Sequence, residues 1–284
     1  MKHYRCVQLC LLSFSIFSCT SEPSTNSRSA PDHPIQNREI ATLPDNHHIE
    51  VVVHRGANHL APENTYAAAA KAIELGVDYV EIDVHLSLDG VHYIIHDFTL
   101  GRTTDGWGPV RLRNSEYIDL LDAGSWFNEA YTGEPVPRLS EYLNWIKGKA
   151  KVYLDVKTAD LEEVVDIIRE LQMEEDVFFW FWNDGMAHKF RELSPDMGLK
   201  INAGSPEEAR KAKAEFDATL IECHVDQLTE ELKKVCRDLG MRIMVYADSN
   251  TPEEYERVIS SEVDLVNLDR PELYIQVLDS IRSE

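Results

Sequence analysis

Residues 79–97 read YVEIDVHLSLDGVHYIIHD, and this stretch decides the fold of the chain. It holds two short runs rich in β-branched and aromatic residues, 79–84 and 91–95, each typical of a strand. The turn signal Leu88-Asp89-Gly90 stands directly before the second run. Because a parallel crossover between strands needs about a dozen residues or more, the two runs must form an antiparallel hairpin.

The register of this hairpin determines which side chains meet. With Asp89-Gly90 as a two-residue turn, Asp83 lies opposite His96. A slip of one residue places Asp83 opposite Ile95 and leaves His96 a near neighbour. Glu81 and Asp83 are two residues apart on one strand, so their side chains point to the same face. The hairpin therefore brings a histidine beside a pair of carboxylates.

Runs of the same kind recur along the chain, with helical patterns between most of them. In order, the runs lie at 49–54, 79–84, 91–95, 151–156, 177–182, 198–202, 219–223, 242–247 and 264–268. Ser205-Pro206-Glu207-Glu208 and Thr251-Pro252-Glu253-Glu254 each supply an N-cap, a proline at the first helical position and a glutamate at the third. Strands that feed helices in this way predict a parallel sheet with crossover helices.

The hairpin explains why there is one run too many for an eight-stranded barrel. If 91–97 is its return arm, eight parallel strands remain. We therefore predict an α/β fold, a (β/α)₈ TIM barrel over residues 49–284, with an antiparallel hairpin after the second strand and a small insertion at about 99–138. An open doubly wound sheet is the alternative, but it would leave the polar residues at the strand ends without a shared mouth.

The amino-terminal segment is not part of this domain. Residues 1–18 have a basic start and an apolar stretch that is too short to span a bilayer, which fits a secretory signal. The stretch ends in Ile16-Phe17-Ser18-Cys19, which resembles a bacterial lipobox; an ordinary signal with a chance cysteine is the alternative. We expect lipidation of Cys19, a flexible tether over 19–48, and an exported protein anchored to an envelope membrane, periplasmic or surface-exposed.

The composition limits the partners of the protein. The formal net charge is −22 at pH 7, so the surface repels nucleic acids and anionic membrane surfaces. A phosphate-bearing substrate must therefore be held by a metal or by a few placed basic residues. Beyond residue 19 the cysteines are Cys223 and Cys236. We expect both to be buried apolar residues, although an oxidising compartment would permit a disulfide, and no zinc-type spacing is present.

Polar residues stand where four neighbouring strands are predicted to end, which is where barrel enzymes place reactive groups. Glu81, Asp83 and Asp155 are three carboxylates expected to face one point, and they repel each other unless a cation lies between them. Oxygen ligands favour one hard ion, Ca²⁺ or Mg²⁺, over zinc. The full set of polar residues at these strand ends is His54, Arg55, Glu81, Asp83, His96, Asp155 and Lys157.

Histidines and basic residues complete the parts that phosphoryl transfer requires. His54 and His96 can act as general acid and base near neutral pH. Arg55 can bind phosphate oxygens as a fork, and Lys157 can bind them as a point charge. Together with a hard cation, these groups provide charge neutralisation and proton transfer.

The order of these motifs resembles that of the glycerophosphodiester phosphodiesterase family. The resemblance covers residues 50–272 and is most specific in the first half. It implies a (β/α)₈ barrel with an insertion, bound Ca²⁺ or Mg²⁺, and release of glycerol 3-phosphate and an alcohol from small glycerophosphodiesters. The matching segments are His54-Arg55-Gly56, Pro62-Glu63-Asn64-Thr65, Glu81-Ile82-Asp83-Val84, Leu88-Asp89-Gly90, His96-Asp97, Arg102-Thr103-Thr104, Val136-Pro137-Arg138-Leu139-Ser140-Glu141 and Val263-Asp264-Leu265-Val266-Asn267-Leu268-Asp269-Arg270-Pro271.

The resemblance also implies roles for single residues. The family usually has Glu where this chain has Asp155, whereas the related sphingomyelinase D enzymes have Asp there. Trp180-Phe181-Trp182 and Val245-Tyr246 replace the Ser-Phe and Trp-Thr pairs of the family, and we expect them to line the pocket for the alcohol. The residues that match are His54 and His96 for the acid–base pair, Glu81 and Asp83 for metal ligands, and Arg55 and Lys157 for contacts to the phosphate.

Two other functions are compatible with the same residues. One is a phospholipase of the sphingomyelinase D kind that acts on lysophospholipids or sphingolipids at a membrane, which requires an apolar rim. Trp107, Trp126, Trp180 and Trp182 are candidates for that rim, although we expect most of them in the core. The other is a non-catalytic protein that binds phosphodiesters through the metal and the two basic residues without using the histidines.

Overall fold

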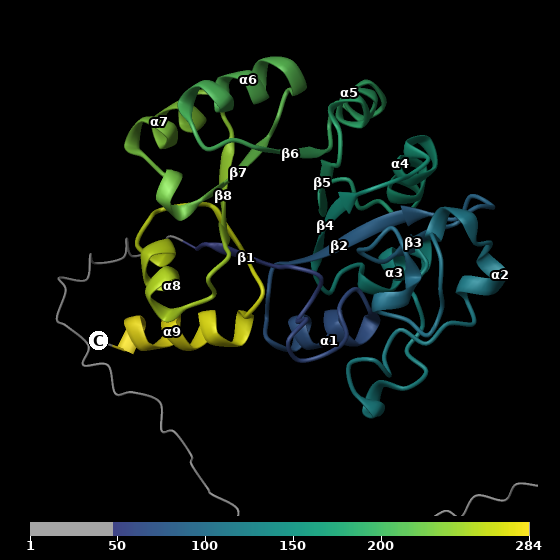
Figure 1. Cartoon of the computed structure of the whole chain (residues 1–284). Coiled ribbons are helices and arrows are strands. Elements are labelled where there is room, and N and C mark those ends of the chain that lie inside the picture. The colour runs from purple at the N-terminus through teal and green to yellow at the C-terminus, as the bar shows by residue number, and fades with distance from the viewer. Residues whose placement is uncertain (1–47, 284) are drawn as a thin grey trace, which may run out of the picture. The chain divides into compact units, whose positions relative to one another are not determined.

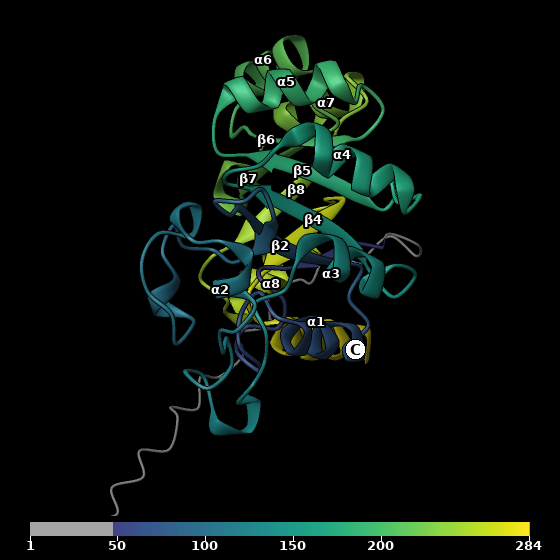
Figure 2. The same ribbon diagram turned by 90° about the vertical axis from the view of Figure 1, so that its right-hand side faces the viewer.

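Eight parallel strands form a closed ring in the computed structural model, which describes residues 48–283. Each strand pairs with the next, and β1 pairs with both β2 and β9, which closes the barrel (Figures 1 and 2). The predicted TIM barrel is confirmed, and the open sheet is wrong. The strands are β1 (Glu50–Val53), β2 (Tyr79–Leu86), β4 (Lys151–Val156), β5 (Val177–Phe181), β6 (Gly198–Asn202), β7 (Leu220–His224), β8 (Arg242–Ala247) and β9 (Leu265–Leu268).

Helices surround this ring on its outer side (Figure 2). The Ser205 and Thr251 side chains each accept a backbone N–H three residues on, so both predicted helix starts are confirmed. The signal segment 1–18, Cys19 and almost all of the tether lie outside the described residues. The helices are α1 (Tyr66–Glu74), α3 (Leu139–Ile146), α4 (Leu161–Glu170), α5 (Asp184–Leu193), α6 (Pro206–Phe216), α7 (Glu230–Asp238), α8 (Pro252–Ile259) and α9 (Pro271–Ser283).

Apolar side chains plug the interior of the barrel below its mouth. The Tyr153 and Phe178 rings stack there with their centroids 4.6 Å apart. This layer leaves the upper ends of the strands as the place where polar side chains can face inward. The plug consists of Val52, Tyr79, Tyr153, Phe178, Leu220, Met244 and Leu265.

The hairpin is present, but its turn differs from the two-residue turn. β3 (His92–Ile94) pairs antiparallel with β2, and the Ile95 N–H donates to the Asp83 carbonyl at 3.0 Å. Asp83 therefore lies opposite Ile95, which is the alternative register. Gly90 has a φ of +88° and is the last residue of a three-residue loop, with pairing resumed at Val91.

The insertion consists of loops and short helices with a small core of its own. Trp107 is 70 % exposed, Trp182 57 % and Trp126 41 %, so the expectation that most of these tryptophans are buried is wrong. The helical pieces of the insertion are Leu100–Arg102, Val110–Leu112, α2 (Ser115–Ile118) and Glu129–Tyr131, and its core is Tyr93, Ile95, Leu100, Val110, Ile118, Leu121, Ala123 and Val136.

Two further sequence features are the cysteines beyond residue 19 and the apolar character of the helices. Cys223 on β7 and Cys236 on α7 are both buried free thiols within the described residues, as expected. Burial raises the pKa of each thiol, to about 12 and about 11. Between residues 48 and 283, none of the helices has the length and apolar character needed to cross a membrane.

Candidate active site

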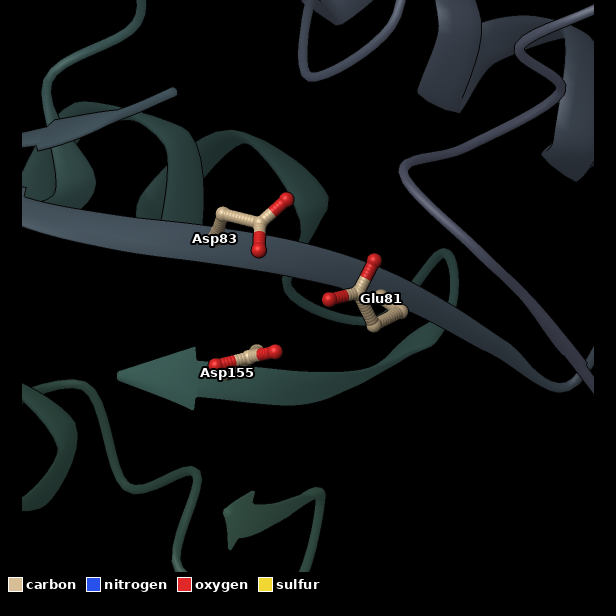
Figure 3. Close-up of side chains that lie close together, drawn as sticks. All are labelled: Glu81, Asp83 and Asp155. Carbon is tan, nitrogen blue, oxygen red and sulfur yellow. The ribbon is translucent and has the colours of Figure 1, made fainter. Parts of the chain in front are cut away.

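Three carboxylates from two adjacent strands converge at the barrel mouth. Asp83 on β2 and Asp155 on β4 are directly paired residues, and Glu81 lies two positions before Asp83 on the same face. One oxygen of each carboxylate lies within 4.8 Å of an oxygen of the others, and Figure 3 shows the three groups turned toward a common point. Glu81 and Asp83 are buried. The register of two parallel strands therefore creates the predicted acidic group.

The electrostatics of this group favour a bound cation. Burial and the charge of Asp83 raise the pKa of Glu81 to about 8. The same two causes raise the pKa of Asp155 to about 6. Asp155 Oδ1 is buried without a hydrogen-bond partner in the described part of the chain. A hard cation would satisfy this oxygen and remove the repulsion among the three carboxylates, so the residues present fit a divalent ion with oxygen ligands.

Two basic side chains flank the carboxylates. Lys157 Nζ lies 2.5 Å from Asp155 Oδ2 and 3.1 Å from Asp83 Oδ1. Arg55 adopts a left-handed φ of +57°, which directs its backbone N–H to Glu81 Oε2 at 2.6 Å. Its side-chain Nε is buried, 3.5 Å from Asp83 Oδ2, without a hydrogen bond among residues 48–283. An anion at this position would meet both a guanidinium donor and an ammonium.

His54 is oriented by a carboxylate from the last strand end. The loop after β9 carries Asp269, whose Oδ1 lies 2.9 Å from His54 Nδ1. The Asn58 side-chain amide donates to the same oxygen at 2.8 Å. Burial lowers the pKa of His54, but the hydrogen bond to Asp269 and the charge of Glu81 outweigh it and raise the pKa above its usual value. The contact leaves the second ring nitrogen, Nε2, as the one that can exchange a proton.

His96 has an arrangement of the same kind on the hairpin side. Its Nδ1 lies 2.7 Å from Asp97 Oδ1. Arg102 from the insertion donates to both oxygens of Asp97, at 2.8 and 2.9 Å, and its hydrogen bonds hold the pKa of that carboxyl well below its usual range. Arg102 also bonds Glu63 at 2.7 and 2.8 Å, and Glu63 in turn accepts from Arg55. Glu63 thereby links Arg102 of the insertion to Arg55 beside the carboxylates.

The residues that hold these groups in place were not predicted from the sequence as site residues. Asn64 donates to Asp83 Oδ2 at 2.8 Å, and Asp269 binds the ring of His54. Both lie inside motifs quoted for the family resemblance, so their presence was visible, although their partners were not. The structure brings together all of the predicted site residues it describes; Cys19 lies outside the described residues.

Comparisons with known proteins agree on one family. The model of the Glycerophosphoryl diester phosphodiesterase family matches residues 54–273. A glycerophosphodiester phosphodiesterase of Caldanaerobacter subterraneus subsp. tengcongensis is 32 % identical over 237 residues, which cover 80 % of this chain and 97 % of that protein.

Solved structures similar to this chain include members of the same family. The crystal structure of a glycerophosphodiester phosphodiesterase from Agrobacterium tumefaciens is similar with a TM-score of 0.78 and 38 % identity, covering 81 % of this chain and 100 % of that one. A phosphodiesterase from Oleispira antarctica, solved in complex with the product sn-glycerol-3-phosphate, has a TM-score of 0.71 and 26 % identity, covering 84 % and 97 %.

Proposed function

The chain belongs to the glycerophosphoryl diester phosphodiesterase family, and from this premise we propose that it hydrolyses glycerophosphodiesters to glycerol 3-phosphate and an alcohol. The observation that carries the proposal is the convergence at one barrel mouth of an acidic triad, two basic side chains and two histidines, each histidine bonded to its own aspartate. We infer one divalent cation, Ca²⁺ or Mg²⁺, held by Glu81, Asp83 and Asp155. When bound, the cation supplies charge neutralisation at the phosphate.

The side chains of this protein supply the remaining chemistry. Arg55 and Lys157 hold phosphate oxygens next to the carboxylates, Arg55 through its Nε, which has no hydrogen bond within residues 48–283. Of His54 and His96, one accepts the proton of the nucleophile, which is water or a hydroxyl of the substrate's own glycerol. The other donates a proton to the leaving oxygen. The aspartate behind each ring fixes its orientation and tautomer.

Product analysis tests this function. Purified protein with Ca²⁺ or Mg²⁺ should release glycerol 3-phosphate and choline from glycerophosphocholine, and glycerol 3-phosphate and ethanolamine from glycerophosphoethanolamine. Release of phosphocholine instead would place the cleaved bond on the wrong side of the phosphorus. Absence of turnover with tight binding of the diester would favour the non-catalytic binding protein.

A phospholipase acting on lysophospholipids is the second candidate, and one observation favours it. Phe98 and Trp182 are exposed large apolar residues whose rings meet with centroids 5.9 Å apart, and Trp182 lies 5.4 Å from Lys157 Nζ. An apolar rim thus stands beside the phosphate-side lysine, as a lipid substrate requires. Lysophosphatidylcholine and sphingomyelin in the same assay distinguish the two functions. Faster turnover of either lipid than of glycerophosphocholine would identify the protein as a phospholipase.

We also propose that the protein is exported and held on an envelope membrane by a lipid on Cys19. The support is the lipobox-like Ile16-Phe17-Ser18-Cys19 after a short apolar stretch. Cys19→Ser should move the protein from the membrane fraction to the soluble fraction, and mass spectrometry of the wild type should find the lipid. A Cys19→Ser protein that stays on the membrane contradicts the proposal.

A further inference from the structure

The barrel mouth continues past the carboxylates into a small polar cavity. Its volume is about 180 Å³, and His54, Glu81 and Asp155 line its near side. Its far side is formed by Trp180, Lys200, Asn202, Glu222, Tyr246 and Asn267.

A buried charge pair forms part of this cavity. Lys200 is 2 % exposed, and its Nζ donates to Glu222 Oε2 at 2.5 Å and to Asn202 Oδ1 at 2.8 Å. An ammonium has three donors, so one donor remains beyond these two contacts. A buried ion pair is seldom the most stable way to fill space in a barrel, since apolar residues of similar volume do so at lower cost. The pair is therefore better explained by a ligand than by packing.

One acceptor at the same cavity has no partner. Asn267 is 5 % exposed, and its Nδ2 donates to Glu222 Oε1 at 3.0 Å. That bond identifies the amide nitrogen, and Asn267 Oδ1 is left buried without a hydrogen bond within residues 48–283. A buried acceptor without a partner costs about 1–3 kcal/mol. A ligand that brings a hydroxyl donor would remove this cost.

The donors and acceptors select the ligand. Lys200 supplies a donor and Asn267 Oδ1 an acceptor, and Lys200 and Glu222 neutralise each other, so the far side of the cavity has no excess charge to bind an ion. An alkyl chain would leave the amide oxygen unsatisfied. A neutral group with adjacent hydroxyls satisfies both sites, because each hydroxyl donates and accepts. Every glycerophosphodiester carries such a group in its glycerol half, whereas the alcohol half differs from one glycerophosphodiester to another.

We propose that this cavity is the subsite for the glycerol half of the substrate, with Lys200, Glu222 and Asn267 as its specificity-determining residues. The proposal rests on the proposed function and deepens it. His54 lines the cavity and so faces the glycerol half, whereas the leaving alcohol lies toward Phe98 and Trp182. Trp180 and Tyr246, which the family resemblance assigned to the alcohol side, belong to the glycerol side.

Binding of partial ligands tests the subsite without turnover. The variant Lys200→Met/Glu222→Gln removes both charges together and leaves no single buried ion. Full-length wild type and variant, loaded with Ca²⁺, are titrated calorimetrically with glycerol 3-phosphate, phosphocholine and inorganic phosphate. We expect the variant to bind glycerol 3-phosphate roughly tenfold to a hundredfold more weakly, with the other two changed less than about twofold.

Each other result has a defined meaning. Equal loss for all three ligands, loss confined to phosphocholine, or no loss overturns the subsite. Asn267→Ala provides a second variant if the double variant does not fold, and the same pattern is expected of it. Lys151→Met is the matched control, because Lys151 is a strand lysine paired with Glu50 at the opposite end of the barrel. It should leave all three affinities unchanged.

The two proposals fail in different ways. Wild type that binds glycerol 3-phosphate with the expected pattern but hydrolyses no glycerophosphodiester refutes the proposed function and leaves the subsite standing. Wild type that hydrolyses glycerophosphocholine while the variant retains full affinity for glycerol 3-phosphate refutes the subsite alone. Wild type that binds no glycerol 3-phosphate refutes the subsite outright, and the hydrolysis assay then decides the function separately.

Discussion

The half of the barrel formed by β1, β2 and β4 differs from the half formed by β5 to β8 in what its strand ends carry. The first half presents three carboxylates, an arginine and a lysine that crowd each other, with two carboxyl pKa values raised by burial and mutual repulsion. The second half presents aromatic rings and a buried charge pair whose members satisfy each other. We read the first half as the reacting centre and the second as the recognition surface.

Removal of the cation should have the largest effect on hydrolysis, and it changes only the first half of the barrel, where the acidic triad lies. EDTA should lower hydrolysis of glycerophosphocholine by roughly a thousandfold or more, because the ion offsets several kcal/mol of charge in the transition state. Added Ca²⁺ or Mg²⁺ should restore it. Full activity after thorough chelation, with no metal found by elemental analysis, would show that the acidic triad has another role.

The histidine substitutions come next. His54→Ala and His96→Ala should each lower kcat by at least roughly a hundredfold, and the double variant should lose much less than the product of the two. Metal content and melting temperature should change little, since neither ring is a proposed ligand. His188→Ala on α5 is the control and should retain full turnover. A His96→Ala protein that lacks the metal would make His96 a ligand instead.

Asp269→Asn should have a smaller effect with a distinctive pH signature. The hydrogen bond to Asp269 is a main cause of the raised pKa of His54, so loss of the negative charge lowers that pKa. The limb of the pH–rate profile that belongs to His54 should therefore move to lower pH, and kcat at the optimum should fall about tenfold. A purely structural role would lower the melting temperature without moving either limb.

Glycine substitutions compare the turns of the two halves and should give the smallest effect. Gly240→Ala, before β8, meets open space and carries only the cost of a φ of +64°, about 1 kcal/mol in the free energy of unfolding. Gly56→Ala, after β1, has a φ of +73° and would also place its Cβ 2.8 Å from Ala68 Cβ. It should cost at least about twice as much in urea denaturation. Equal losses in the free energy of unfolding for the two variants would show that the backbone around Gly56 shifts to accommodate the added Cβ.

The strands and the acidic triad were predictable because their signals are local or periodic. Buried β-branched runs marked every strand of the ring to within one or two residues, and the alternation of Glu81 and Asp83 fixed their shared face. The hairpin turn was wrong by one residue because Gly90 can take a positive φ in either a two-residue or a three-residue loop. Nothing in the sequence distinguishes the two.

Long-range partners were not predictable. Asp269 lies 215 positions after the histidine that it orients, and the Lys200–Glu222 pair joins two neighbouring strands whose register only the closed barrel defines. Most of the four rim tryptophans were expected in the core, and nothing local in the sequence marks Trp107, Trp126 and Trp182 as exposed.

The contact between His54 and Asp269 has a consequence for how the protein matures. A chain still leaving the ribosome cannot contain an oriented His54 until its final strand has formed and closed the ring. Full activity therefore serves as a marker of completed folding. In a refolding experiment, turnover should return with the slowest structural phase and not with the early appearance of helices.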